Sequence, residues 1–163
     1  GTVRDLLLNR DQVFWVGDPN FILLASGAAV VVFFTAHLVE SRLRWVIWLD
    51  SFALAIAVSA GTGAALSMGK PAVIVVLMGM ATGSLGGLMR DVVVGEVPLV
   101  LKQGELYISC AMIGAIVAVA AISLGITSGL ALILCAGVCW GLRAGSIAFG
   151  WHLPVYKSRP PRS

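Results

Sequence analysis

Two opposite charges stand next to a glycine pair inside an apolar part of the chain. The stretch GGLMRDVVVGEVP places Arg90 and Asp91 three and four positions after Gly87, in a run that begins at Gly86. A charged side chain at the centre of a membrane costs about 2.5–3.5 kcal/mol, so such groups face the protein interior or a water-filled path. Glycines weaken a helix, and backbone carbonyls freed there can replace the hydration shell of a cation. The combination predicts a polar path through the protein.

The same residues have a second interpretation. Gly79, Gly83 and Gly87 are four positions apart and share one face of a helix, a spacing that lets two helices pack closely. Arg90 and Asp91 would then form a charge pair at a helix end, where a positive group is favourable. For one isolated copy of the motif, both interpretations stay open.

A second copy of the motif lies at the start of the chain. In an alignment of residues 1–22 with residues 87–108, Gly1, Arg4 and Asp5 meet Gly87, Arg90 and Asp91. An odd number of predicted membrane crossings separates the copies, so they have opposite orientations. Inverted repeats of this kind are typical of transporters and channels. The repetition favours a central path over a local charge pair.

Five apolar runs are long enough to position these residues in a membrane, since a helix of about 20 residues spans the hydrocarbon core. The runs are Phe21–Val39, Trp45–Leu66, Pro71–Val94, Leu106–Leu124 and Leu130–Phe149. Residues 1–8 have the pattern of the last part of another helix. We therefore expect an all-α integral membrane protein whose chain begins inside a helix.

Composition supports this class and excludes others. The 163 residues are 59% hydrophobic and 12% charged, whereas soluble domains have about 25% charged residues. The basic residues are scattered without aromatic interleaving, which argues against a nucleic-acid partner. Ser, His and Asp do not cluster, the cysteines lack metal-ligand spacing, and there is no phosphate loop. We expect no enzyme, no metal and no cofactor, and the lipid bilayer as the surroundings.

The distribution of Lys and Arg predicts the orientation, because cytoplasmic connections carry more of them. One side collects Arg42, Arg44, Lys102 and the basic residues of the tail 151–163, and the other collects Arg10 and Lys70. The C-terminus is therefore predicted to be cytoplasmic.

Four further polar residues within the spans are candidates for the path. Asp50 can attract cations at a pore mouth, pair with an arginine of the tail, or be a plain interfacial carboxylate. Ser59 and Thr62 can offer hydroxyls to a pore or bond to their own helix backbone. Arg143 is a functional candidate because it is an intramembrane arginine, and the alternative is a bond to neighbouring carbonyls that fixes its helix.

At these motifs the sequence resembles the bacterial branch of the TRIC family, the trimeric intracellular cation channels. The resemblance rests on GGLMRDVVVGEVP and on three further stretches: LDSFALAIAVSAG (49–61), LYISCAMIG (106–114) and LRAGSIAFGWHLP (142–154). It implies a seven-helix fold of two inverted three-helix repeats plus a final helix, of which this chain lacks the first helix and half of the second. The implied parts are the remainder of repeat 1 (1–43), repeat 2 (44–125), the last helix (126–150) and a cytoplasmic tail (151–163).

The resemblance also implies a multi-pass homotrimer in the prokaryotic plasma membrane, with a pore in each protomer at the kinks of two helices. The implied path residues are Gly83, Gly86, Gly87, Arg90, Asp91, Gly1, Arg4 and Asp5, and the permeating ion is potassium or sodium, with bound lipid as a further partner. Leu85 departs from the family, which often has three consecutive glycines at the kink.

Two alternatives to a passive channel stay open. One is a secondary transporter of a small polar solute such as glycine, which inverted repeats suit equally well. The other is a helical scaffold, which gains little from buried charges.

Overall fold

The computed structural model describes residues 1–39, 43–95 and 106–150, and all regular structure in these ranges is helical. The helices in chain order are α1 (Thr2–Leu7), α2 (Phe14–Gly17), α3 (Asn20–Val39), α4 (Leu43–Ser67), α5 (Ala72–Val94), α6 (Tyr107–Ser123) and α7 (Ser128–Phe149). The five predicted apolar runs correspond to α3–α7, and every end lies within two residues of its predicted position. The all-α prediction is therefore confirmed.

Three of the described helices are long and apolar enough to cross a membrane. They are Ile47–Ser67, Ala72–Val93 and Ser128–Phe149, while α6 and the segment Asn20–Thr35 of α3 are apolar but shorter. Arg42, Lys102 and the tail 151–163, on which the predicted orientation depends, lie outside the described residues. The orientation stays a prediction.

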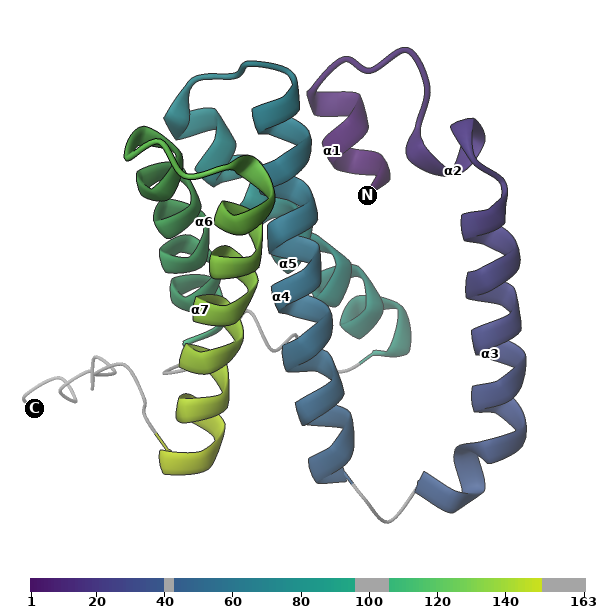
Figure 1. Ribbon diagram of the computed structural model, residues 1–163. Coiled ribbons are helices and arrows are strands. Elements are labelled where there is room, and N and C mark those ends of the chain that lie inside the picture. The colour runs from purple at the N-terminus through teal and green to yellow at the C-terminus, as the bar shows by residue number, and fades with distance from the viewer. Residues whose placement is uncertain (40–42, 96–105, 151–163) are drawn as a thin grey trace, which may run out of the picture.

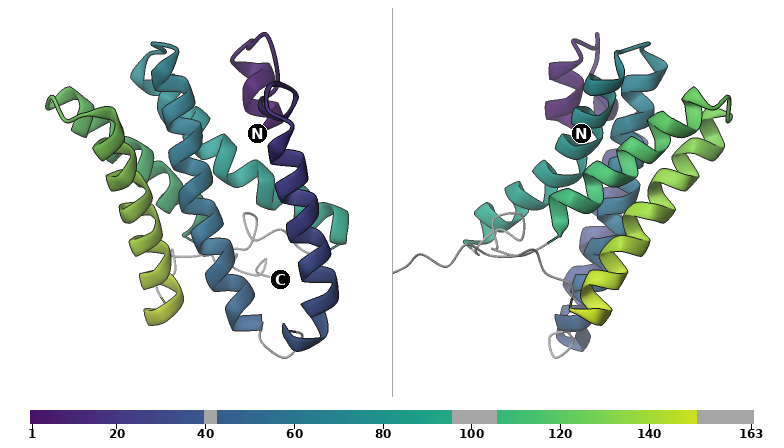
Figure 2. Two further views of the ribbon diagram at one scale, coloured as in Figure 1. Left: turned by 45° about the vertical axis from the view of Figure 1, so that its right-hand side comes forward. Right: turned by 90° about the vertical axis from the view of Figure 1, so that its left-hand side faces the viewer.

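Helices α4–α7 pack against one another as one bundle, in which α4 contacts the other three (Figures 1 and 2). Its core is built mainly from small side chains, which let the helix axes approach closely. The buried residues of this core are Leu54, Ala55, Val58, Tyr107, Cys110, Ala111, Ala115, Ala118, Cys135 and Cys139. Close packing of this kind suits a membrane bundle, where lipid supplies no hydrophobic force between helices.

Helix α3 stands apart from the bundle and is reached through the short α2 (Figure 1). Its apolar side chains are largely exposed, with Leu24 at 75% and Phe33 at 77% of their surface. In water, exposed side chains of this size would be unfavourable, whereas lipid tails are as apolar as they are. The exposed surface of α3 therefore agrees with a membrane protein.

Sharp turns join the helices of the bundle in pairs. Gly69, with φ of +63°, follows α4, and Gly125, with φ of +84°, follows α6. At both turns the glycine N–H bonds to the carbonyl three residues back, and the next N–H bonds to the carbonyl five residues before it. This pairing is the Schellman motif, and the left-handed conformation it needs is the one that glycine adopts without strain.

The two copies of the motif lie on helices that run in opposite directions. In Figure 1, α1 ends near the turn from which α5 starts, and α5 then runs away from that turn, in the opposite direction to α1. Arg4–Asp5 lies on α1 and Arg90–Asp91 in the last turns of α5, so the two copies have opposite directions, as the inverted repeat predicts.

Candidate functional site

In both copies of the motif, the arginine binds the aspartate that follows it, through the same atoms. Arg4 Nε and Nη2 lie 2.8 and 2.6 Å from Asp5 Oδ1. Arg90 Nε and Nη2 lie 2.9 and 2.8 Å from Asp91 Oδ1. Equal geometry at aligned positions supports the register of the repeat that the sequence predicts.

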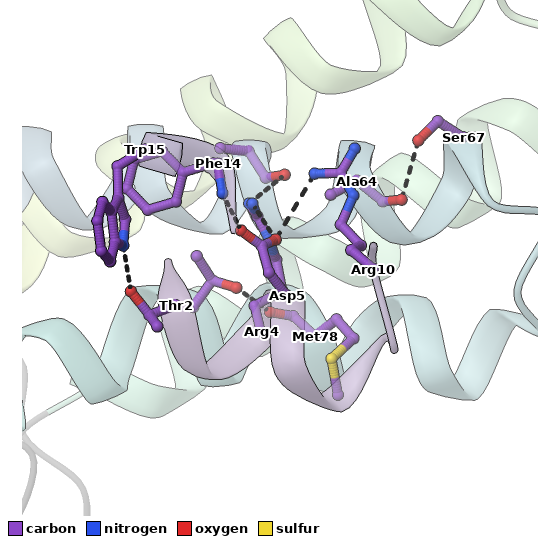
Figure 3. A network of polar contacts seen from close by, with 11 residues as sticks. Thr2, Arg4, Asp5, Arg10, Phe14, Trp15, Ala64, Ser67 and Met78 are labelled. Carbon is purple, nitrogen blue, oxygen red and sulfur yellow. Dashed lines mark hydrogen bonds and ion pairs between the residues drawn. The ribbon is translucent and has the colours of Figure 1, made fainter. Parts of the chain in front are cut away.

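Around Asp5, a loop of the chain folds back to complete the coordination of the carboxylate (Figure 3). The Phe14 N–H donates to Asp5 Oδ2 at 2.9 Å, and Arg10 Nη1 lies 3.6 Å from Asp5 Oδ1. Asp5 is 1% exposed and Arg4 is 8% exposed, so this charge pair is removed from solvent. A buried carboxylate with several donors stays charged at low cost, because each donor offsets part of its lost hydration.

A helix end explains how Arg10 reaches Asp5. Asn9 has φ of +54°, and the Asn9 and Arg10 N–H groups bond to the Leu6 and Asp5 carbonyls. This is the pattern of the Schellman motifs described above, with asparagine in the left-handed position. The sequence analysis assigned Arg10 only to a connection. The signal for its contact with Asp5 was Asn9, a residue that tolerates the left-handed conformation after a helix end.

At the other copy, Arg90 joins α5 to α4. Arg90 Nη1 donates to Asp50 Oδ1 at 2.7 Å, so the guanidinium lies between the carboxylates of Asp50 and Asp91. The side chains of Asp50 and Asp91 are 7% and 8% exposed, whereas that of Arg90 is 46% exposed. The structure pairs Asp50 with Arg90, a partner that the sequence did not indicate; its predicted position at a pore mouth stays a prediction, and the tail arginines lie outside the described residues.

Next to this pair, Tyr107 of α6 and Arg143 of α7 stack. The Arg143 guanidinium carbon lies 5.3 Å from the centre of the Tyr107 ring, within the range of a cation–π contact. Both residues are 2% exposed. The Tyr107 hydroxyl would lie 3.0 Å from a Cβ added at Gly87, so the tyrosine also borders α5. Arg143 of α7 therefore contacts Tyr107 of α6, and its predicted place on the path stays a prediction.

The glycines of α5 face different neighbours. A Cβ added at Gly83 would lie 2.6 Å from Val58 Cγ2 of α4, and one at Gly87 would lie 3.0 Å from the Tyr107 hydroxyl. At Gly86, no atom lies within 4 Å of an added Cβ. Gly83 and Gly87 thus permit close packing, and only Gly86 faces open space.

Gly86 lines a groove of about 280 Å³ between α1 and α5. Its lining combines residues of both motif helices: Gly1, Thr2, Val3, Arg4, Ala81, Thr82, Leu85, Gly86 and Met89. Along this groove α5 is one continuous helix from Ala72 to Val94, so it does not break at the glycine pair. A kink there, without a break, stays a prediction.

The structure places Ser59 and Thr62 away from this groove. The Ser59 hydroxyl donates to the Leu132 carbonyl of α7 at 3.0 Å. Thr62 has no exposed surface and lies against Gly79 of α5. Ser59 thus bonds to another helix and not to its own backbone. Within residues 1–39, 43–95 and 106–150, no group of three His, Cys, Asp or Glu side chains has the geometry of a metal site.

Comparison with curated proteins finds membrane proteins of one family. The chain is 35% identical over 161 residues to a UPF0126 membrane protein of Vibrio cholerae, covering 95% of this chain and 64% of that protein. It is 32% identical over 156 residues to the UPF0126 membrane protein YvgT of Bacillus subtilis, covering 94% of this chain and 75% of that protein. It is 34% identical over 118 residues to the UPF0126 inner membrane protein YadS of Escherichia coli, covering 72% of this chain and 56% of that protein. The chain thus spans less than two thirds of the length of the Vibrio and Escherichia relatives and three quarters of the Bacillus one. A family model described as glycine transporter matches residues 47–123.

Solved structures of TRIC channels also match this chain over most of its length. The TRIC trimeric intracellular cation channel orthologue from Rhodobacter sphaeroides matches with a TM-score of 0.87 and 40% identity, over 92% of this chain and 77% of that one. A second structure, described as the structural basis for conductance through TRIC cation channels, matches with a TM-score of 0.87 and 26% identity, over 98% of this chain and 78% of that one. Because the fold, the mirrored Arg–Asp pairs and the identity to a solved member agree, this chain is a membrane protein that belongs to the bacterial branch of the TRIC family.

Proposed function

We propose that the protein is a passive channel for monovalent cations, potassium or sodium, with the path along the groove between α1 and α5. The observation that carries this proposal is the groove itself, since it brings the two inverted motif helices face to face. Solved relatives are described as cation channels. In this proposal each protomer of a homotrimer conducts, and the C-terminus lies in the cytoplasm of a prokaryotic cell.

Local charge balance supports passage of a cation. The positive charge of Arg90 is compensated by Asp50 and Asp91, and that of Arg4 by Asp5. Pairing at these distances lowers the barrier that a free arginine would present to a cation. At Gly86 no atom lies within 4 Å of an added Cβ, so the groove has room there for water or an ion beside the helix.

One observation favours a second candidate, transport of a small amino acid such as glycine. At the Asp50–Arg90–Asp91 cluster the guanidinium is 46% exposed and both carboxylates are below 10%, so the accessible charge is positive. An exposed guanidinium suits the carboxylate of a zwitterion better than it suits a cation. The glycine transporter family model points the same way.

Flux through the full-length protein in liposomes separates the two candidates. We would impose a potassium gradient, control the voltage with an ionophore, and record ion flux with and without external glycine. The variants are Arg90→Ala and, as a matched control, Lys70→Ala in the connection between α4 and α5.

A channel gives potassium flux without glycine, changed by Arg90→Ala and unchanged by Lys70→Ala. Saturable glycine uptake without independent ion flux would reject the channel and support the carrier. Absence of both activities would reject both and favour a scaffold.

A further inference from the structure

Both motif arginines bind the same helix, at two levels. Arg4 Nη1 donates to the Ala60 carbonyl of α4 at 3.4 Å, and Arg90 Nη1 donates to Asp50 of α4 at 2.7 Å. Positions 50 and 60 are ten residues apart, which corresponds to roughly 15 Å along a helix. Helix α4 therefore holds the two arginines at separate heights beside the α1–α5 groove.

At the Arg4 end, the contacts come largely from the chain around α1 itself. Asp5 binds Arg4, Arg10 and the Phe14 N–H, and the contact of Arg4 with α4 is made to a main-chain carbonyl. Substitution of an α4 side chain leaves this main-chain acceptor for Arg4 in place. This end is fixed by several bonds that do not depend on one side chain of α4.

At the Arg90 end, the bond to α4 is made by the Asp50 side chain. Upstream of the glycine pair, α5 is anchored because Gly83 packs against Leu54 and Val58 of α4. Downstream, the apolar side chains of Met89, Val92 and Val93 are 58%, 63% and 86% exposed and pack little on the bundle, whereas Asp91 is 6% exposed and binds Arg90. The Arg90–Asp50 pair is thus a charged link between the last two turns of α5 and α4.

We propose that Asp50 is a positioning residue that holds Arg90 against α4 and so keeps residues 88–94 of α5 in their position beside the groove. Loss of this pair lets the segment move from α4 about Gly86 and Gly87, and water then reaches the groove from that end. The Arg4 end stays fixed, so the path has one end that opens and one that does not. This inference rests on the proposed function in one respect, that the groove is the path.

Reaction of a single cysteine with a water-soluble thiol reagent tests the proposal without relying on flux. Met89→Cys lies in the groove and reports the end that opens, and Val3→Cys on α1 reports the fixed end. The three natural cysteines of this chain are at most 2% exposed, so their background reaction is small. The labelling rates are compared in full-length protein in liposomes, with the natural Asp50 and with Asp50→Asn and Asp50→Glu.

We expect Asp50→Asn to raise the reaction rate at Met89→Cys by about fivefold, the factor for loss of a partly exposed ion pair. Asp50→Glu keeps the charge and restores the slow rate, and the rate at Val3→Cys stays the same. Asp11→Asn, which removes an exposed carboxylate, is the matched control.

Equal rates at Met89→Cys in Asp50 and Asp50→Asn protein would overturn the proposal, as would equal acceleration by Asp50→Glu. If Asp50→Asn does not fold, Arg90→Gln breaks the same pair from its exposed partner and must give the same acceleration. Flux is recorded on the same samples. Flux without the labelling response rejects Asp50 as the positioning residue, whereas the labelling response without flux rejects the channel.

Discussion

Alanine at Gly83 and at Gly86 should have opposite effects on stability, although the two glycines are three positions apart on one helix. At position 83 an added Cβ lies 2.6 Å from Val58 Cγ2 and 3.0 Å from Leu54 Cδ1. Val58 and Leu54 are 0% and 2% exposed, so neither side chain has free space into which it can move. At position 86 nothing lies within 4 Å.

Two terms determine the size of the difference. Replacing glycine by alanine in a helix interior gains up to about 1 kcal/mol, and this term is common to both positions. Overpacking a buried contact costs about 1–3 kcal/mol and applies at position 83 alone. Because the common term cancels, Gly83→Ala should be less stable than Gly86→Ala by about 1–3 kcal/mol. For a chain of this size, the middle of that range corresponds to roughly 4–8 °C in Tm.

The assay is thermal unfolding of both variants and the wild type in the same detergent. Unfolding is measured as the loss of the folded-protein peak, trimer or monomer, on size exclusion after heating. A Gly83→Ala protein as stable as Gly86→Ala would refute the close packing of α5 on α4. A loss of stability at Gly86→Ala would refute the open environment of that glycine.

Two more substitutions test the charged groups. Asp5→Asn leaves the buried Arg4 without its carboxylate and should lower the free energy of unfolding by about 3–5 kcal/mol. Arg10→Ala removes a partly exposed partner 3.6 Å from Asp5 and should lower it by at most about 1 kcal/mol. Equal losses of Tm would contradict the conclusion that Asp5 stabilises the fold mainly through Arg4. Tyr107→Phe keeps the ring under Arg143 and should be milder than Tyr107→Leu, which loses a cation–π contact of about 0.5–2 kcal/mol; the reverse order of Tm would argue against the stacking.

Much of the fold follows from patterns that are local in sequence. The five long helices could be predicted because a membrane span needs about 20 apolar residues, and polar connections mark where each run ends. The repeat of Gly-x-x-Arg-Asp gives the side-chain geometry of both pairs, since arginine and aspartate are neighbours in each. These features depend on few residues and on short distances along the chain.

The partners of the site could not be predicted, because they come from distant elements. Asp50 and Arg90 are 40 positions apart, and nothing in either stretch indicates which helix faces the other. The glycine spacing predicted that Gly79, Gly83 and Gly87 share one close-packing face, and all three meet packed neighbours: α4 at Gly79 and Gly83, and Tyr107 of α6 at Gly87. Periodicity defines a helix face but not the neighbour that covers it.

The paired turns after α4 and α6 have a consequence for how the protein is made. Helix α4 packs most extensively on α5, its immediate successor, and α6 on α7. Each pair is joined by a Schellman turn at Gly69 or Gly125, which needs no contact with the rest of the chain. Each pair can therefore form as a helical hairpin while later residues are still being synthesised. Because most contacts join neighbours in sequence, the entropy cost of bringing partners together is small, and folding in the membrane should be fast.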